Sequence, residues 1–349
     1  MHARPWRRVA LVTLVALTLA IPTLAQVRPV GLSDSQEPGS VLVFPKFLAG
    51  TTANGEPRSE FEIGITCPRG AEGGPGLCAE GTRVKLRAHW VCPGSQDPEQ
   101  KYICDEANFD LVSTVTGTIV INPANVGHVT QRVPLPPCAA GYLIVWVINP
   151  SDQPIKYDAL LGTGVLRELD DHEAVSAYNG IPIQANAAAA TGTVLPSLTF
   201  APGGPYQAVT GQVQGTVTYD QLDTSPYAVT ALTLLTLDVR SNRPNYPTRV
   251  DLDFYSENEV LVSTSHEFVC WSSILLSDLN PNLTATGLSP KGLVVSEQAV
   301  KVPIGGIADT AGPVTLLGIV ETATWNDACR VYSYALYNNS VPVPTVFEP

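Results

Sequence analysis

A short sequence pattern occurs twice in this chain, at the same distance from a cysteine. Residues 82–86 read TRVKL, and Thr82 lies 22 residues before Cys104; residues 248–252 read TRVDL, and Thr248 lies 22 residues before Cys270. A repeat at so long an interval is typical of tandem domains and not of a solenoid of short units. The pattern therefore predicts two copies of one module, with a chance similarity between strand-like segments as the alternative.

Each pattern is followed by an apolar run and then by an Ala-Leu pair. The runs are residues 142–147 and 316–320, and the pairs are Ala159-Leu160 and Ala335-Leu336. We expect these segments to occupy equivalent places in the two copies.

Short runs of β-branched and aromatic residues recur from Ser40 onward, with Gly, Pro, Asn and Asp between them. Such runs predict an all-β fold. The 30 prolines suit turns and the edges of antiparallel sheets, but would interrupt parallel or central strands. The predicted strands are residues 41–44, 61–66, 83–91, 115–121, 142–148, 229–237, 249–255, 260–264, 268–276, 292–295, 314–322 and 330–336. Residues 164–177 predict a short helix, with a loop as the alternative.

The strand rhythm stops at residues 183–204, which are rich in alanine and proline. We place the boundary between two domains at about residues 195–208. The predicted architecture is two tandem antiparallel β-sandwich domains, Ig-like or jelly-roll-like. The domains span residues 40–195 and 208–349, and a polar arm, residues 26–39, precedes them.

The N-terminus has the pattern of a secretory signal peptide. Arg4, Arg7 and Arg8 precede the apolar residues 9–21, and the small residues of a cleavage site follow. Cleavage after Ala25 would remove residues 1–25 and export the rest, either to the periplasm or to the cell surface and extracellular space. No later segment approaches about 20 consecutive apolar residues, so we expect no membrane insertion.

The mature chain is predicted to be strongly acidic. Three of the 20 Lys and Arg lie in the signal peptide, which leaves 17 against 32 Asp and Glu, a net charge of −15. Such a chain repels nucleic acid and anionic membranes, and neither is an expected partner.

The chain has seven cysteines, and an exported chain enters an oxidising compartment. The sequence contains no CxxC pair of the kind found in metal and redox sites, so we expect disulfides. Cys67 with Cys78 would close a Gly-rich insertion, and Cys92 with Cys104 would join a polar hairpin. Cys270 and Cys329 are the two cysteines of the second half, and we pair them. Cys138 then remains as a buried thiol, or alternatively as an intermolecular bridge.

The two repeated strands are predicted to carry opposite charge on their outer faces. Alternation buries Val84, Leu86 and Ala88 in the first copy, and Val250, Leu252 and Phe254 in the second. The outward residues are Arg83, Lys85 and Arg87 in one copy and Arg249, Asp251 and Asp253 in the other. These faces could bind head to tail between molecules; ordinary solvated faces are the simpler interpretation.

No catalytic, cofactor or metal site is evident. The mature histidines, His89, His128, His172 and His266, stand apart, and the common hydrolase and nucleotide motifs are missing. Acidic clusters could bind calcium, although charged loops are the simpler interpretation; these clusters are Asp170, Asp171, His172 and Glu173, and Asp251 and Asp253 with Glu257 and Glu259. No exposed aromatic stripe marks a sugar site.

Three segments carry a family resemblance: residues 39–46 (GSVLVFPK), 141–145 (GYLIV) and 157–162 (YDALLG). They resemble a group of bacterial secreted proteins of unknown function with an SVLVFP-type opening strand, a GYIVA-type strand and a YLIGD-type turn. Here Thr163 follows Gly162 where that group has Asp. The resemblance covers mainly residues 39–180; it implies export and a β-rich fold, but no activity or site.

The sequence therefore predicts a secreted, non-enzymatic structural or interaction protein of the bacterial cell exterior, without a cofactor. Its partner would be another protein or its own copies. The alternative is a carbohydrate-binding or calcium-dependent adhesin module. A third possibility, a hydrolase, would require a pocket with paired carboxylates or a histidine beside a nucleophile.

Overall fold

The computed structural model describes most of the chain between residues 37 and 348. The described ranges are 37–68, 76–79, 81–95, 102–169, 174–186, 188–221, 227–240, 244–286, 288–303, 312–325, 330–336, 342–343 and 345–348. The expected signal peptide, the start of the arm, the cluster Asp170, Asp171, His172 and Glu173, and Cys329 lie outside them. Within these ranges one short helix, α1 (Leu276–Leu279), accompanies many antiparallel strands. The predicted all-β class is confirmed.

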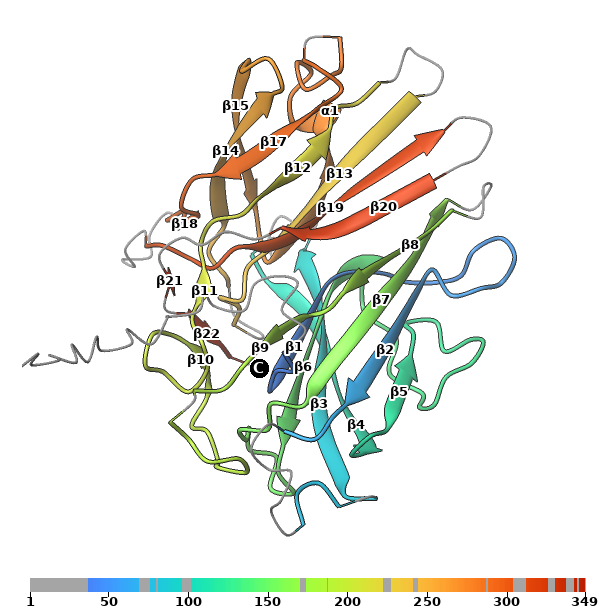
Figure 1. Ribbon diagram of the computed structural model, residues 1–349, viewed down its shortest axis with the longest axis vertical. Coiled ribbons are helices and arrows are strands. Elements are labelled where there is room, and N and C mark those ends of the chain that lie inside the picture. Colours follow the sequence, from blue (N-terminus) through green and yellow to red (C-terminus); the bar gives the residue numbers. More distant parts are fainter. Residues whose placement is uncertain are drawn as a thin grey trace, which may run out of the picture.

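The first half of the chain forms two antiparallel sheets. One has the strand order β4-β3-β6-β1-β9, and the other has the order β5-β2-β7-β8 (Figure 1). The strands are β1 (Val41–Leu48), β2 (Ser59–Ile65), β3 (Arg83–Gly94), β4 (Cys104–Thr114), β5 (Thr118–Ile121), β6 (Ala140–Ile148), β7 (Leu160–Leu169), β8 (Ala174–Asn179) and β9 (Ile181–Ile183).

The second half also forms two antiparallel sheets, with the orders β12-β17-β14-β15 and β16-β13-β19-β20, and β18 pairs with β14. The strands are β12 (Gln214–Thr218), β13 (Tyr227–Leu235), β14 (Thr248–Ser256), β15 (Leu261–Phe268), β16 (Trp271–Leu275), β17 (Lys291–Ser296), β18 (Val300–Lys301), β19 (Leu317–Trp325) and β20 (Arg330–Leu336). Short strands between the halves are β10 (Leu198–Phe200), β11 (Val209–Thr210), β21 (Pro342–Val343) and β22 (Thr345–Phe347).

The two halves have corresponding strand orders. If β12 to β17 are matched to β1 to β6, and β19 and β20 to β7 and β8, then each sheet of the second half repeats the order of one sheet of the first. The repeated residues 82–86 and 248–252 lie at the start of β3 and β14, which correspond.

The other expected equivalences between the halves are wrong. Cys104 opens β4, whereas Cys270 follows β15. The two apolar runs lie in β6 and β19, which do not correspond, and neither do the Ala-Leu pairs, because Leu160 opens β7 and Leu336 ends β20. The runs resemble each other because both strands are buried on both faces, a condition that replaces alternation by continuous apolar sequence.

Strands β1 and β6 lie at the centre of the molecule. Leu42 and Phe44 of β1 face the cluster between the two sheets of the first half, where Phe61 and Trp90 also pack. The alternate residues of β1, Val41 and Val43, face the opposite way into a second cluster. This cluster also contains Tyr142, Ile144 and Trp146 of β6. Complete burial of such a side chain contributes roughly 1.5–3 kcal/mol, so β1 and β6 stabilise two cores at once.

The second cluster joins the halves of the chain. It contains Leu235, Trp271 and Leu317 from the second half, together with Phe347 near the C-terminus. The segment at residues 195–208, where we place the domain boundary, lies within it: Leu195, Leu198, Phe200 and Tyr206 are buried there. Two strand pairs, β10 with β22 and β11 with β21, bring the C-terminal residues back to this segment.

Buried polar contacts also link the halves. The Lys46 ammonium lies 2.6 Å from the Glu321 carboxylate, and both side chains are almost fully buried. The Trp271 indole N–H donates to the Pro45 carbonyl, and the Tyr142 hydroxyl donates to that of Thr236. Loss of one partner of a buried ion pair costs about 3–5 kcal/mol, because the other charge is left uncompensated. This interface therefore resists separation.

The disulfide pattern corrects the sequence prediction in part. Cys67 bonds to Cys78, the pair that the Gly-rich insertion indicated. Cys138 is not a thiol but bonds to Cys92. Cys104 bonds to Cys270 and so connects the two halves, in place of the expected pairs Cys92–Cys104 and Cys270–Cys329. Grouping cysteines by domain failed because the halves pack closely enough for a bridge between them.

The first half has strands where the sequence predicts a helix or a loop. The helix or loop expected at residues 164–177 is instead parts of β7 and β8, which pair with each other. Its apolar spacing suits a strand with a register shift between Arg167 and Leu169 as well as it suits a helix. The alternation predicted for the repeated strands is confirmed, because Val84, Leu86, Val250 and Leu252 are buried.

We expect the Cys104–Cys270 bridge to stabilise the fold more than the Cys67–Cys78 bridge does. It spans 166 residues, against 11 for Cys67–Cys78. Chain-entropy arguments assign about 4.7 kcal/mol to a loop of about 100 residues and about 3 kcal/mol to one of about 15. Urea unfolding without reductant measures the free energy of unfolding of each double variant. The variant Cys104→Ala with Cys270→Ala should lose more of this free energy than the variant Cys67→Ala with Cys78→Ala. An equal or smaller loss would contradict this ranking.

Candidate functional site

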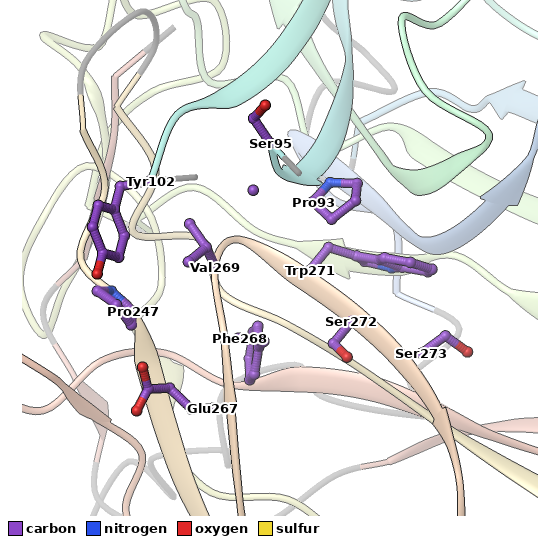
Figure 2. Close-up of a pocket in the computed structure, with 11 residues that line it drawn as sticks. Pro93, Ser95, Tyr102, Pro247, Glu267, Phe268, Val269, Trp271, Ser272 and Ser273 are labelled. Carbon is purple, nitrogen blue, oxygen red and sulfur yellow. The ribbon is translucent and has the colours of Figure 1, made fainter. Parts of the chain in front are cut away.

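A pocket of about 460 Å³ lies at the junction of the two halves. It is formed where the end of β3 and the residues before β4 approach the corner between β15 and β16. In Figure 2, Tyr102 and Pro247 lie on one side of this junction pocket, Pro93 and Trp271 on the other, and Val269 between them. The lining residues are Pro93, Gly94, Ser95, Tyr102, Pro247, Glu267, Phe268, Val269, Trp271, Ser272 and Ser273.

The corner between β15 and β16 shapes the pocket. Cys270 has a left-handed backbone, with a φ of 63°, which side chains other than glycine adopt at a cost. The Trp271 N–H donates to the Val269 carbonyl, and so does the Gly94 N–H from the first half. The disulfide from Cys270 to Cys104 holds the same corner. These contacts maintain the strained turn and keep the pocket walls in place.

The walls combine aromatic and polar groups. Phe268 and Trp271 are almost fully buried, so their rings are part of the structure and do not form an exposed platform for a sugar. Glu267 is exposed on the rim. Tyr102 is held through its carbonyl, which accepts the Asn245 N–H. These residues come from distant parts of the chain and meet only through the contact between the halves.

Ser272, which lines the pocket, forms a hydrogen bond with His266, which does not line it. Its hydroxyl oxygen lies 2.8 Å from His266 Nε2, and this contact connects β15 to β16. Burial lowers the pKa of His266, which favours the neutral ring. A catalytic triad also needs a carboxylate that orients the ring through its other nitrogen. Among the described residues no carboxylate bonds to His266, so the pair lacks that member.

The remaining histidines do not converge on this site. His89 is fully buried, with Nδ1 at 3.1 Å from a Glu106 carboxylate oxygen and its ring against Trp146. His128 is exposed, and His172 lies outside the described residues. Within the described ranges, no group of three or more His, Cys, Asp and Glu side chains could hold a metal ion.

The charged faces of β3 and β14 both form ion pairs with residues of this same chain. Lys85 lies 2.8 Å from Asp110 and 2.6 Å from Asp152, and Arg87 contacts the same two carboxylates. Hydrogen bonds to Asp110 and Asp152 raise the pKa of Lys85. Arg83 is exposed. The basic face is therefore largely compensated by acids of its own half.

The acidic face is compensated less. Asp251 accepts hydrogen bonds from Arg249, and Asp253 accepts one from the Ser263 hydroxyl, a neutral group. Because the basic face already has partners, the arrangement supports ordinary solvated faces over a head-to-tail contact between molecules.

Comparisons with known proteins add little. No protein-family model matches the chain, and no curated protein matches it. Among solved structures, the chemokine-binding protein R17 of rodent gammaherpesvirus Peru is 7% identical, with 90% of this chain and 88% of that one covered and a TM-score of 0.15. The CupB6 tip adhesin of Pseudomonas aeruginosa is 8% identical, with 87% and 92% covered and a TM-score of 0.13. Scores this low carry no argument about fold or function.

Within the described ranges, no helix has the length and apolar character needed to span a bilayer.

We expect His266 to make stability depend on pH. Its folded pKa lies below the ordinary value of 6.5, so the folded state binds fewer protons than the unfolded chain. This contribution is present above pH 6.5 and is lost as the pH falls through that value toward the folded pKa. Urea unfolding over this window should show a weaker pH dependence for His266→Gln than for the wild type. His128→Gln, which changes an exposed ring, is the matched control for the substitution itself. A slope in His266→Gln equal to that of the wild type would contradict the assignment.

Proposed function

We propose that this chain is a secreted, non-enzymatic structural or interaction protein of the bacterial cell exterior. It presents a rigid β surface to a protein partner or to its own copies. One observation carries the proposal: the halves are joined into one body by a continuous core, a buried ion pair and the Cys104–Cys270 disulfide. The all-β, disulfide-bonded fold is compatible with an extracellular interaction protein.

Rigidity has a physical consequence for binding. A partner that binds a preorganised surface does not have to order it, so less of the interaction energy is lost. Disulfides persist in oxidising compartments, which supports a place outside the cytoplasm. The expected signal peptide at residues 1–25 also supports export, because such a segment directs a chain out of the cytoplasm.

We also propose that the two halves are copies of one module. The corresponding strand orders and the shared start of β3 and β14 support a duplication. The halves have since diverged at their junction, where Cys104 and Cys270 occupy different positions relative to the strands.

Export and association can be tested in one experiment on cells that produce the full-length chain. We expect the mature protein to begin at Gln26, to lie outside the cytoplasm and to carry the three disulfides. A membrane-impermeant amine crosslinker added to intact cells should then join it to a protein, either another chain or its own copy. Mass spectrometry identifies the N-terminus and the crosslinked peptides. A cytoplasmic chain that retains residues 1–25, or an exported chain without intermolecular crosslinks, would contradict the proposal.

A hydrolase is the second candidate, because Ser272 lines the junction pocket and forms a hydrogen bond with His266. Without an orienting carboxylate, we expect the serine to be unactivated. A fluorophosphonate probe should therefore leave the purified protein unlabelled. Labelling that is lost in Ser272→Ala but kept in Ser273→Ala, a change on the same wall of the pocket, would replace the proposed function by this one.

A further inference from the structure

Strand β15 forms an open edge of its sheet. Its eight residues pair with β14 on one side, and no other described strand pairs with it (Figure 1). Its first residue, Leu261, is half exposed. An exposed edge of this length presents a row of unpaired backbone groups to another strand.

The register with β14 shows which backbone groups face outward. Ser256 N–H donates to the Val260 carbonyl, so these two residues form a hydrogen-bonded pair. Hydrogen-bonded and non-bonded pairs alternate along antiparallel strands. The even-numbered residues of β15 therefore bond to β14, and the odd-numbered residues point their N–H and C=O groups to the open edge. These outward residues are Leu261, Ser263, Ser265 and Glu267.

The opposite side of β14 confirms this alternation. The Asp251 carbonyl accepts the Glu297 N–H, so an odd-numbered residue of β14 faces away from β15. Asp253 and Tyr255 pair with Val295 and Leu293 of β17 on that same side.

Each of the corresponding edges of the first half is capped at one residue. On β4 the side-chain amide of Gln131 accepts the Val112 N–H and donates to its carbonyl. On β5, Thr130 makes the equivalent contacts with Val120, through its hydroxyl and its backbone N–H. One loop thus caps both edges. Among the described residues no side chain caps β15 in this way.

Charge does not protect the edge either. Strand β4 carries exposed acids at Asp105 and Asp110, and charged side chains are a common defence against pairing between edges. Glu267 is the only acidic or basic residue of β15 apart from His266, and the strand contains no proline.

We propose that β15 pairs antiparallel with β15 of a second copy, around a two-fold axis at Thr264. This inference rests on the proposed function and names its partner. In this register the outward residues of one copy meet those of the other: Ser263 lies opposite Ser265, and Leu261 opposite Glu267. Each such pair can exchange two backbone hydrogen bonds.

The sequence of β15 suits this register. Thr264 meets its own copy on the axis, and Thr–Thr and Ser–Ser pairs are favourable across strands. The single acid, Glu267, faces Leu261 and not another acid. A two-fold contact uses the same patch on both molecules and closes after two copies. The sheets β12-β17-β14-β15 of the two copies become one continuous sheet.

The first test blocks the outward hydrogen bonds. Ser265→Pro removes an N–H that faces the open edge and leaves every bond to β14, so the fold should be retained. Asn108→Pro is the matched control, because Val115 N–H bonds to Thr82 and alternation turns Asn108 N–H outward from β4. Light scattering over a concentration series should give a dimer for the wild type and for Asn108→Pro. Ser265→Pro should weaken the dimer by about tenfold or more, the effect of about 1.4 kcal/mol.

The second test reports the register itself. Thr264→Cys places two thiols on the axis in a non-bonded pair, where the Cβ atoms of facing residues lie about 4.5–5.5 Å apart. Mild oxidation of the full chain should produce a covalent dimer. Ser265→Cys should produce much less, because the two Ser265 residues are displaced from each other along the strands.

Each result decides the proposal. A wild-type monomer at all concentrations overturns it, and so does a dimer that Ser265→Pro leaves intact or that Ser265→Cys traps as well as Thr264→Cys. The proposed function can survive this failure, because crosslinks on intact cells would then join the exported chain to a different protein. Failure of the proposed function would appear instead as absence of export or of any intermolecular crosslink.

Discussion

The double-sided burial of β1 and β6 is the constraint on which the rest of the structure depends. One face of these strands packs between the sheets of the first half, and the other packs against the second half and the C-terminal strands. A strand with two buried faces cannot alternate polar and apolar side chains, so its sequence becomes a continuous apolar run. The second half is consequently not a neighbour on a flexible tether. It supplies one wall of the core that β1 and β6 need.

The polar links between the halves follow from this packing. Lys46 lies on β1, and its ammonium reaches Glu321 on β19 in a region from which water is excluded. Cys104 and Cys270 lie in different halves and meet because the junction brings β4 to the corner after β15. The same corner forms the junction pocket and ends at the open edge of β15. Stability and the surface for association are therefore built from the same contacts.

The first half and the second half manage their sheet edges differently. In the first, residues Thr130 and Gln131 of one loop cap β5 and β4. In the second, the corresponding edge strands β15 and β16 are linked to each other through His266 and Ser272, and β15 remains open on its outer side. Two halves with corresponding strand orders can thus carry one capped and one open edge, and the difference lies in loops and not in strand order.

The sequence by itself determined the all-β class, the inward and outward sides of β3 and β14, and the Cys67–Cys78 pair. These properties depend on neighbours along the chain: Val84 and Leu86 alternate with charged residues, and Cys67 and Cys78 are close in sequence. Only the tertiary structure decided that Cys138 bonds to Cys92, that Cys104 bonds to Cys270, that Lys85 and Arg87 are ion-paired within their own half, and that β15 is an edge. Each of these depends on which distant strands lie side by side, and that is set by the packing of whole sheets, for which a local pattern carries no information.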